Sequence, residues 1–211
     1  MAAGRTGKRR PLHRTRLGAV VGVILTALLL PSTPTAQAAP VRAPDVITRD
    51  DVVRAFPAFK KVPISRFPGR TFPARTEECT TGPEVTGTSG RVVTGYGDRR
   101  SVTALLVKFA TKAQAKSVFA GFQRFVRGCR QYWAGVDTAL RPVKVPRFGD
   151  QRLGYRLTAT FRPELHEPTI YSRVVLVRDG KRLLLLGIDQ PTKVRAAPFA
   201  RLARVAVRKM G

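Results

Sequence analysis

The pattern of apolar and polar positions is most regular in the second half of the chain. In RLGYRLTATF, apolar side chains occupy every second position from Leu153 to Phe161, which predicts a strand with one face in the core. Two further apolar runs, TIYSRVVLV and KRLLLLGI, flank Asp179-Gly180, and this dipeptide is typical of a tight hairpin turn. Because LLLL contains no polar residue, we expect that strand to be covered on both faces.

A second hairpin is predicted earlier in the chain, in RVVTGYGDRRSVTALLVKFA. Its strands run from Arg91 to Tyr96 and from Ser101 to Ala110. Both faces of the second strand are mostly apolar, so we expect it to lie inside a sheet and not at its edge. Residues 57–90, in contrast, are rich in Pro, Gly and Thr and are predicted to be irregular.

Capping residues and the helical period predict three helices. The first has Thr48 as its N-cap and runs to about Phe56, where Pro57 stops it. A long helix is capped by Thr111 and continues to Trp133. The segment AAPFARLARVAVRKM predicts a closing helix.

The long helix is amphipathic. At 100° per residue, its apolar residues fall within one sector, and these are Val118, Phe119, Phe122, Phe125, Val126 and Cys129. The cysteine therefore belongs to the stripe that we expect to be buried.

The order of these elements indicates the fold class. A helix, strands, a helix, strands and a helix, with two hairpins and no repeated βαβ unit, predict an α+β fold. We expect a single domain built on an antiparallel sheet of about five strands, with helices covering at least one face.

The N-terminus has the composition of an export signal. Six basic residues and no acid precede the 14-residue apolar run from Leu17 to Leu30, and small residues follow. The run is shorter than the roughly 18 to 20 residues that span a bilayer. We predict a signal peptide over residues 1–38, cleaved after Ala38.

The processed chain is then expected to be secreted, without a transmembrane span. Residues 39–45 are predicted to be a flexible segment, and residues 46–211 are predicted to form the folded domain. No cysteine follows the apolar run before Cys79, which argues against lipid attachment beside the cleavage site.

The predicted processed chain remains strongly basic. The whole sequence has 39 basic and 13 acidic residues, and removal of residues 1–38 leaves 33 basic residues and a net charge of +20. Such a charge attracts polyanions, which outside a cell are wall polymers, anionic lipid head groups or shed nucleic acid. The alternative is that the arginines reflect composition and form a solvated face.

A candidate polyanion patch lies on the long helix, opposite its apolar stripe. It consists of Lys112, Lys116, Arg124, Arg127 and Arg130. The aromatic residues of this helix lie on the other side, so the arrangement lacks the exposed aromatics interleaved with bases that single-stranded nucleic acid requires. We expect contacts with phosphate-type groups and no sequence-specific recognition of nucleic acid.

The two cysteines, Cys79 and Cys129, most simply form one disulfide in an oxidising compartment. Such a bond would close a loop of 49 residues and contribute roughly 4 kcal/mol on the chain-entropy model. A catalytic thiol would need a base, and after residue 38 the chain contains one histidine, His166, without a cysteine-protease motif around it. The residues also lack the paired spacing of a zinc site, so no metal or other cofactor is expected.

Several segments together resemble the PknH-type extracellular sensor domain family. They are FATKAQAKSVFAGFQRFVRGC, the hairpin VVLVRDGKRLLLLGI and the closing Ala/Arg-rich helix, and the resemblance covers residues 45–210. Family members usually have two disulfides, whereas this chain can form one, and here Trp133 follows Cys129 instead of preceding it. No kinase accompanies the domain in this sequence.

The resemblance implies an α+β domain with a cleft for an extracellular ligand, and it implies no catalytic residues. Our first hypothesis is a secreted, non-enzymatic binding domain whose ligand is not identified by the sequence. The alternatives are a cationic protein that binds cell-wall or membrane polyanions, and a small hydrolase that uses His166 with a neighbouring glutamate.

Overall fold

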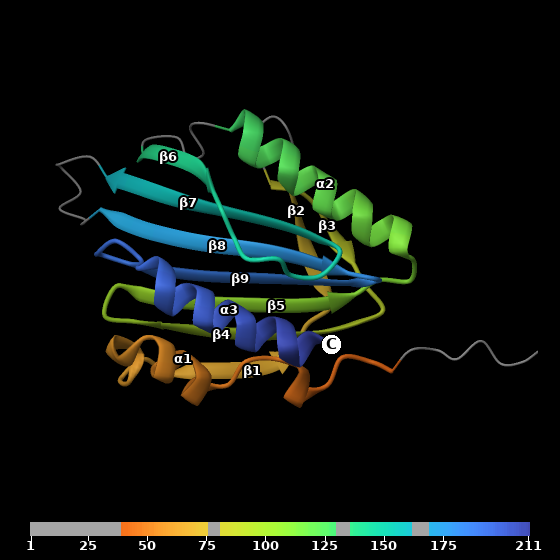
Figure 1. Ribbon diagram of the computed structural model, residues 1–211, viewed down its shortest axis with the longest axis horizontal. Coiled ribbons are helices and arrows are strands. Elements are labelled where there is room, and N and C mark those ends of the chain that lie inside the picture. Colours follow the sequence, from red (N-terminus) through yellow and green to blue (C-terminus); the bar gives the residue numbers. More distant parts are fainter. Residues whose placement is uncertain (1–38, 76–80, 130–135, 162–168) are drawn as a thin grey trace, which may run out of the picture. The chain divides into compact units, whose positions relative to one another are not determined.

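A seven-stranded antiparallel sheet is the main feature of the computed structural model, which describes residues 39–75, 81–129, 136–161 and 169–211 (Figure 1). The strands, in their order across this large sheet, are β1 (Ile64–Pro68), β4 (Ser89–Gly97), β5 (Arg100–Lys108), β9 (Arg182–Gln190), β8 (Ile170–Asp179), β7 (Gln151–Phe161) and β6 (Val136–Val143). A separate two-stranded sheet pairs β2 (Thr71–Arg75) with β3 (Thr81–Thr86).

The predicted α+β class is confirmed, but the predicted number of about five strands is wrong. Residues 57–90, predicted to be irregular, contain β1, β2, β3 and the start of β4. The strand β6 was also missed, because Pro142 lies within it. Prolines are tolerated at sheet edges, and β1 and β6 are the two edge strands of the large sheet.

The two predicted hairpins are confirmed. In the first, Gly97 pairs with Arg100 across the turn between β4 and β5. In the second, β8 and β9 pair from Asp179 and Arg182 onward, with Gly180 at a φ of 54° in the turn. The strand β5 lies between β4 and β9, inside the sheet as its two apolar faces predicted.

The described residues form three α-helices, and two of these begin at the predicted caps. The helix α1 (Arg49–Ala55) is capped by Thr48, and α2 (Lys112–Gly128) is capped by Thr111, whose hydroxyl accepts from the Gln114 amide at 3.0 Å. The closing helix α3 (Ala196–Met210) covers the predicted segment. Two 3-10 helices, η1 (Ala43–Asp45) and η2 (Pro57–Phe59), flank α1.

The helix α2 ends earlier than predicted. Cys129 is already its C-cap, with an extended backbone, and residues 130–135, including Trp133, lie outside the described residues. The predicted apolar stripe is buried over its whole length, from Val118 to Cys129.

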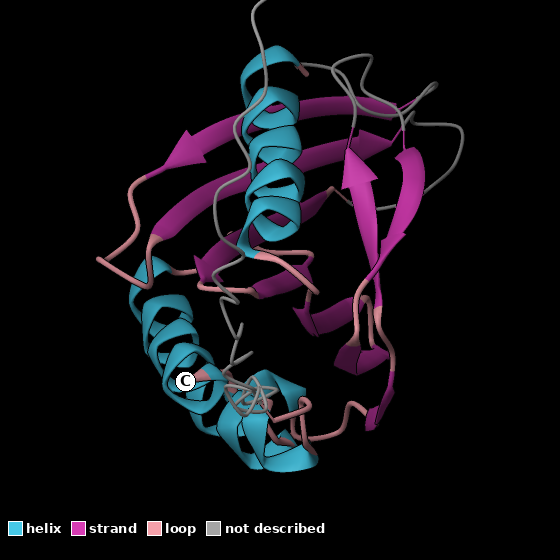
Figure 2. Ribbon diagram, turned by 90° about the vertical axis from the view of Figure 1, so that its right-hand side faces the viewer, coloured by secondary structure: helices cyan, strands magenta, loops and turns pink. Residues whose placement is uncertain are grey.

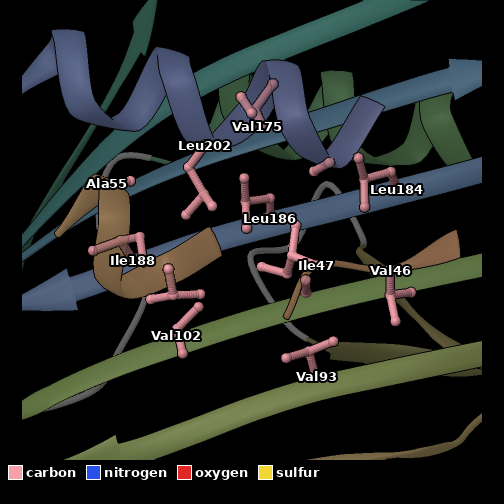
Figure 3. Close-up of a cluster of buried hydrophobic side chains, with 14 of the residues drawn as sticks. Val46, Ile47, Ala55, Val93, Val102, Val175, Leu184, Leu186, Ile188 and Leu202 are labelled. Carbon is pink, nitrogen blue, oxygen red and sulfur yellow. The ribbon is translucent and has the colours of Figure 1, made fainter. Parts of the chain in front are cut away.

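Both faces of the large sheet are covered (Figure 2). On one face, α1 and α3 pack on β4, β5, β8 and β9, and Figure 3 shows Leu202 of α3 close to Leu186, with Ile47 and Val102 nearby. On the other face, α2 and the small sheet pack on β5, β8 and β9, with Phe72, Phe109 and Phe122 at the centre of this second core. We call these the α3 face and the α2 face.

Contacts with the sheet begin inside the segment 39–45, which the sequence predicts to be flexible. Val41 is only 5% exposed, and its amide donates to the Ser89 hydroxyl at 3.0 Å. The predicted signal peptide, residues 1–38, lies outside the described residues. Within the described part of the chain, no helix is long and apolar enough to cross a membrane.

Candidate functional site

A row of paired residues crosses the α2 face of the large sheet. Six neighbouring strands each contribute one residue, and every residue is the register partner of the next. From β4 to β6 the members of this transverse row are Tyr96, Ser101, Asp189, Ser172, Leu157 and Leu140.

A cavity of about 550 Å³ lies over the transverse row. All six residues of the row line it, together with Phe125 of α2 and side chains of β7 and β8 that continue the apolar surface. A volume of this size is within the range of roughly 300 to 1,000 Å³ that holds small ligands. We call this space the α2-side cavity.

The polar groups of the α2-side cavity are concentrated in the middle of the row. The Ser101 hydroxyl donates a hydrogen bond to the Asp189 carboxylate, and Ser172, which is 8% exposed, is the register partner of Asp189 on the next strand. The residues on the β6 side, such as Leu157 and Leu140, are apolar. Besides its basic turn, the cavity therefore has one carboxylate, two serine hydroxyls and the side chains of Tyr96 and Tyr155 in an otherwise apolar lining.

The turn between β4 and β5 adds positive charge to the lining of this cavity. Arg99 and Arg100 both line it, and the Arg100 guanidinium donates to the Asp98 carbonyl at 3.2 Å. Asp98 and Arg99 have φ values of 50° and 58°, in the left-handed region that costs a non-glycine residue about 1 to 2 kcal/mol. Glycine would relieve this strain, so the turn gives up stability while it carries an arginine beside the cavity.

The chain is similar in fold to the extracellular domain of PknH. That domain, from Mycobacterium tuberculosis, superimposes with a TM-score of 0.48 and 9% sequence identity, over 82% of this chain and 96% of that one. A putative uncharacterized protein from Mycobacterium smegmatis superimposes with a TM-score of 0.44 and 14% identity, over 79% of this chain and 98% of its own. No family model and no curated protein matches the sequence. The first of these structures is a domain of the kind that the sequence resembles.

The structure describes one of the two predicted disulfide cysteines. Cys129 is 1% exposed and packs in a small core with Phe125, Leu140 and Tyr155, beside the α2-side cavity. No described cysteine is free. Because Cys79 lies outside the described residues, the Cys79–Cys129 bond stays a prediction.

The predicted polyanion patch lies where the helical period placed it. Lys112, Lys116, Arg124 and Arg127 are exposed along α2, and Arg130 lies outside the described residues. None of the four described members lines the α2-side cavity. The patch is thus a solvated side of one helix, separate from the cavity.

His166, the residue named in the hydrolase hypothesis, lies outside the described residues, so that hypothesis is not tested. Within the described ranges, no group of three or more His, Cys, Asp or Glu residues could hold a metal ion.

Sequence reasoning missed the transverse row completely. Its polar members come from β5, β8 and β9, and each is an ordinary strand residue in its own segment. One weak signal was available, because Asp189 occupies the face of β9 on which Leu183 and Leu185 are core residues. On this face Asp189 follows Leu185 and Gly187. Its carboxylate marks the place where the core ends and the cavity begins.

Proposed function

We propose that this chain is a non-enzymatic binding domain that holds an amphipathic small molecule in the α2-side cavity. The observation that carries the proposal is the transverse row, which places the hydrogen-bonded pair Ser101 and Asp189 in a cavity with an otherwise largely apolar lining. The ligand would have an apolar body, a hydroxyl or amine that donates to Asp189, and an anionic group near Arg99 and Arg100.

The chemistry of the row favours binding over catalysis. A serine next to an aspartate alone lacks the adjacent histidine or amine that activates the hydroxyl of a nucleophilic serine. Among the described residues that line the cavity, the other ionisable side chains are Tyr96, Tyr155, Arg99 and Arg100, and there is no histidine, lysine or cysteine. The same groups are well suited to hydrogen bonding and to pairing with an anion.

The predicted export signal supports an extracellular ligand. A secreted chain meets lipids, wall fragments and small metabolites, and amphipathic compounds occur in each of these classes. The proposal that the ligand is extracellular therefore rests on the predicted signal peptide. The proposal that it binds in the α2-side cavity rests on the transverse row.

A thermal-shift titration tests the proposal. Medium-chain carboxylates, hydroxylated carboxylates, alkyl phosphates and alkylammonium ions of matched length would be compared. At about 100 times Kd, linkage adds about 2.7 kcal/mol, so an anionic amphiphile should raise Tm by roughly 5–10 °C. Alkylammonium ions should have a smaller effect, because the arginines repel them.

Three variants locate the binding site. Ala159→Phe should fill the cavity and abolish the shift, and Asp189→Asn should weaken the binding of hydroxylated ligands. Asp179→Asn, at the other end of β8 from the cavity, is the matched control and should behave as wild type. An unchanged shift in Ala159→Phe would place the ligand elsewhere, and the absence of any stabilising amphiphile would show that the proposal is wrong.

A further inference from the structure

A second cavity lies on the opposite, α3 face of the large sheet. It has a volume of about 300 Å³ and is bordered by β6, β7, β8 and the segment that leads into α3. Its polar side chains are Arg141, Arg156, Arg173, Lys193, Thr158 and Tyr171, with Ser172 also at its border. None of the four described members of the predicted polyanion patch on α2 lines it.

Three of these arginines form a ladder across three strands. Arg141 of β6 is the register partner of Arg156 of β7, and Arg156 is the register partner of Arg173 of β8. Directly opposite residues in an antiparallel pair have Cβ atoms about 4.5–5.5 Å apart, so their side chains leave the sheet side by side. We call these three residues the arginine ladder.

Hydroxyl groups occupy the next position along the same strands. Thr158 and Tyr171 are register partners of each other, and each lies two residues from a member of the ladder, so they share its face. Lys193 completes the border from the segment before α3. The cavity therefore combines four cationic groups with two hydroxyl donors.

Among the residues that the structure describes, no acid neutralises the arginine ladder. In the described part of the chain, no member of the ladder forms an ion pair, and no acidic residue lines the cavity. Like charges directly opposite each other in a sheet are destabilising. Burial lowers the pKa of the Arg173 guanidinium below its usual value, and the charge of Arg156 lowers it further.

We propose that the arginine ladder binds a phosphate-class oxyanion that carries at least two negative charges. Guanidinium groups donate to such an anion in a fork, and a dianion offsets the repulsion that the empty ladder carries. A cavity of about 300 Å³ accommodates a phosphate or pyrophosphate group. This inference is independent of the proposed function, since the two cavities lie on opposite faces of the sheet.

The test uses the full secreted chain in a phosphate-free buffer near neutral pH. Inorganic pyrophosphate is titrated calorimetrically, with chloride at the same ionic strength as the reference anion. We expect saturable binding of pyrophosphate with a Kd that rises with salt, and a weaker response to chloride. No binding of pyrophosphate at physiological ionic strength would overturn the proposal.

Two arginines of β7 provide matched variants. Arg156→Gln removes the centre of the ladder and should raise the Kd for pyrophosphate about tenfold or more. Arg152→Gln makes the same change of charge on the same strand and face, outside the cavity, and should leave the Kd unchanged. Equal weakening in both variants would overturn the proposal, because it would mean that net charge alone attracts the anion.

The stability of Arg156→Gln to urea distinguishes an anion-binding role of Arg156 from a structural one, because the two roles predict changes in opposite directions. If the ladder binds an anion, Arg156→Gln without ligand should be at least as stable to urea as wild type, because repulsion is relieved. If Arg156 instead supports the fold, the variant should unfold at a lower urea concentration, and that result would contradict our proposal.

Vesicles identify the source of the phosphate group. Phosphatidylcholine vesicles that contain phosphatidic acid present a phosphate monoester on a membrane, and pyrophosphate competes for the same site. Binding that Arg156→Gln abolishes supports a lipid head group as the source. Binding of pyrophosphate without binding of these vesicles supports a soluble phosphate compound.

Discussion

Asp51 joins two segments that lie far apart in the sequence. Its carboxylate accepts from the Thr48 amide at 2.8 Å, within the capping box of α1, and lies 2.6 Å from the Lys209 ammonium of α3. Burial raises the pKa of Asp51, but the Lys209 hydrogen bond and charge and the two hydrogen bonds with Thr48 lower it by more, so it lies below 3.8. A single carboxylate thus serves both a helix cap and the contact between α1 and α3.

This shift makes a prediction about stability in acid. Because the pKa of Asp51 is lower in the folded chain than in the unfolded one, its contribution is fully present above about pH 3.8 and is lost as the pH falls through the folded value. Asp51→Asn should lower the free energy of unfolding by about 1–2 kcal/mol at neutral pH and by less in acid. Urea unfolding as a function of pH measures this difference.

Asp50 provides the control, since its side chain is 84% exposed in the first turn of the same helix. Asp50→Asn should change the free energy of unfolding much less than Asp51→Asn at every pH. Equal losses in the two variants would indicate a general effect of negative charge at the N-terminus of the helix and would contradict a specific role for the Lys209 pair.

At the scale of elements, the features that the sequence predicts correctly are local. The caps Thr48 and Thr111 and the turn residues Asp179 and Gly180 act within a few positions of themselves, so one segment is enough to recognise them. The edge strand β1 depends instead on pairing with β4, and β2 and β3 lie between these two strands in the chain. Pro68 and Pro142 make β1 and β6 hard to recognise as strands in the sequence, although a proline in an edge strand destabilises a sheet little.

The candidate sites could not be predicted for the same reason. The transverse row takes one residue from each of six strands, and the arginine ladder takes one from each of three. Arg141, Arg156 and Arg173 are unremarkable in their own segments, and only the register makes them neighbours. The basic residues of α2 were easier to find, because helical periodicity groups them within one segment.

The small sheet and α2 share a core that a disulfide would reinforce. Phe72 of β2 contacts Phe122 of α2, with ring centroids 5.7 Å apart. In the sequence, Cys79 lies between β2 and β3, and Cys129 caps α2. We expect the predicted bond between them to contribute up to about 4 kcal/mol, so reduction should lower the urea midpoint of the protein.

The double variant Cys79→Ala, Cys129→Ala is the control, and reductant should leave its midpoint unchanged. The intact mass of the secreted protein gives a direct check, because a disulfide makes it about 2 Da lighter than the dithiol form and resistant to alkylation. Two thiols that react without reductant would show that the predicted bond is wrong.

At the scale of the whole molecule, the charge balance predicts an unusual response to salt. Thirteen acids can neutralise at most 13 of the 39 basic residues, so repulsion among the remaining cations opposes the compact state. We expect the Tm to rise as sodium chloride increases from low ionic strength to about 0.5 M, because screening weakens this repulsion. Scanning calorimetry measures the change.

A nonionic osmolyte at matched osmolality is the control, because it is excluded from the protein surface but does not screen charges. At low concentration it should not reproduce the rise in Tm that sodium chloride causes. A Tm that falls as salt is added would mean that attractive ion pairs outweigh repulsion, in spite of the net charge.

The large sheet ends on both sides in strands that are poor templates for another strand. At one edge, β1 contains Arg66 and Pro68, and at the other, β6 contains Arg141 and Pro142. Each proline lacks the N–H that an incoming strand would pair with, and each arginine would repel a like-charged edge. The large sheet therefore resists pairing with the sheet of a second molecule. The residue that begins the arginine ladder therefore also protects the protein from edge-to-edge aggregation.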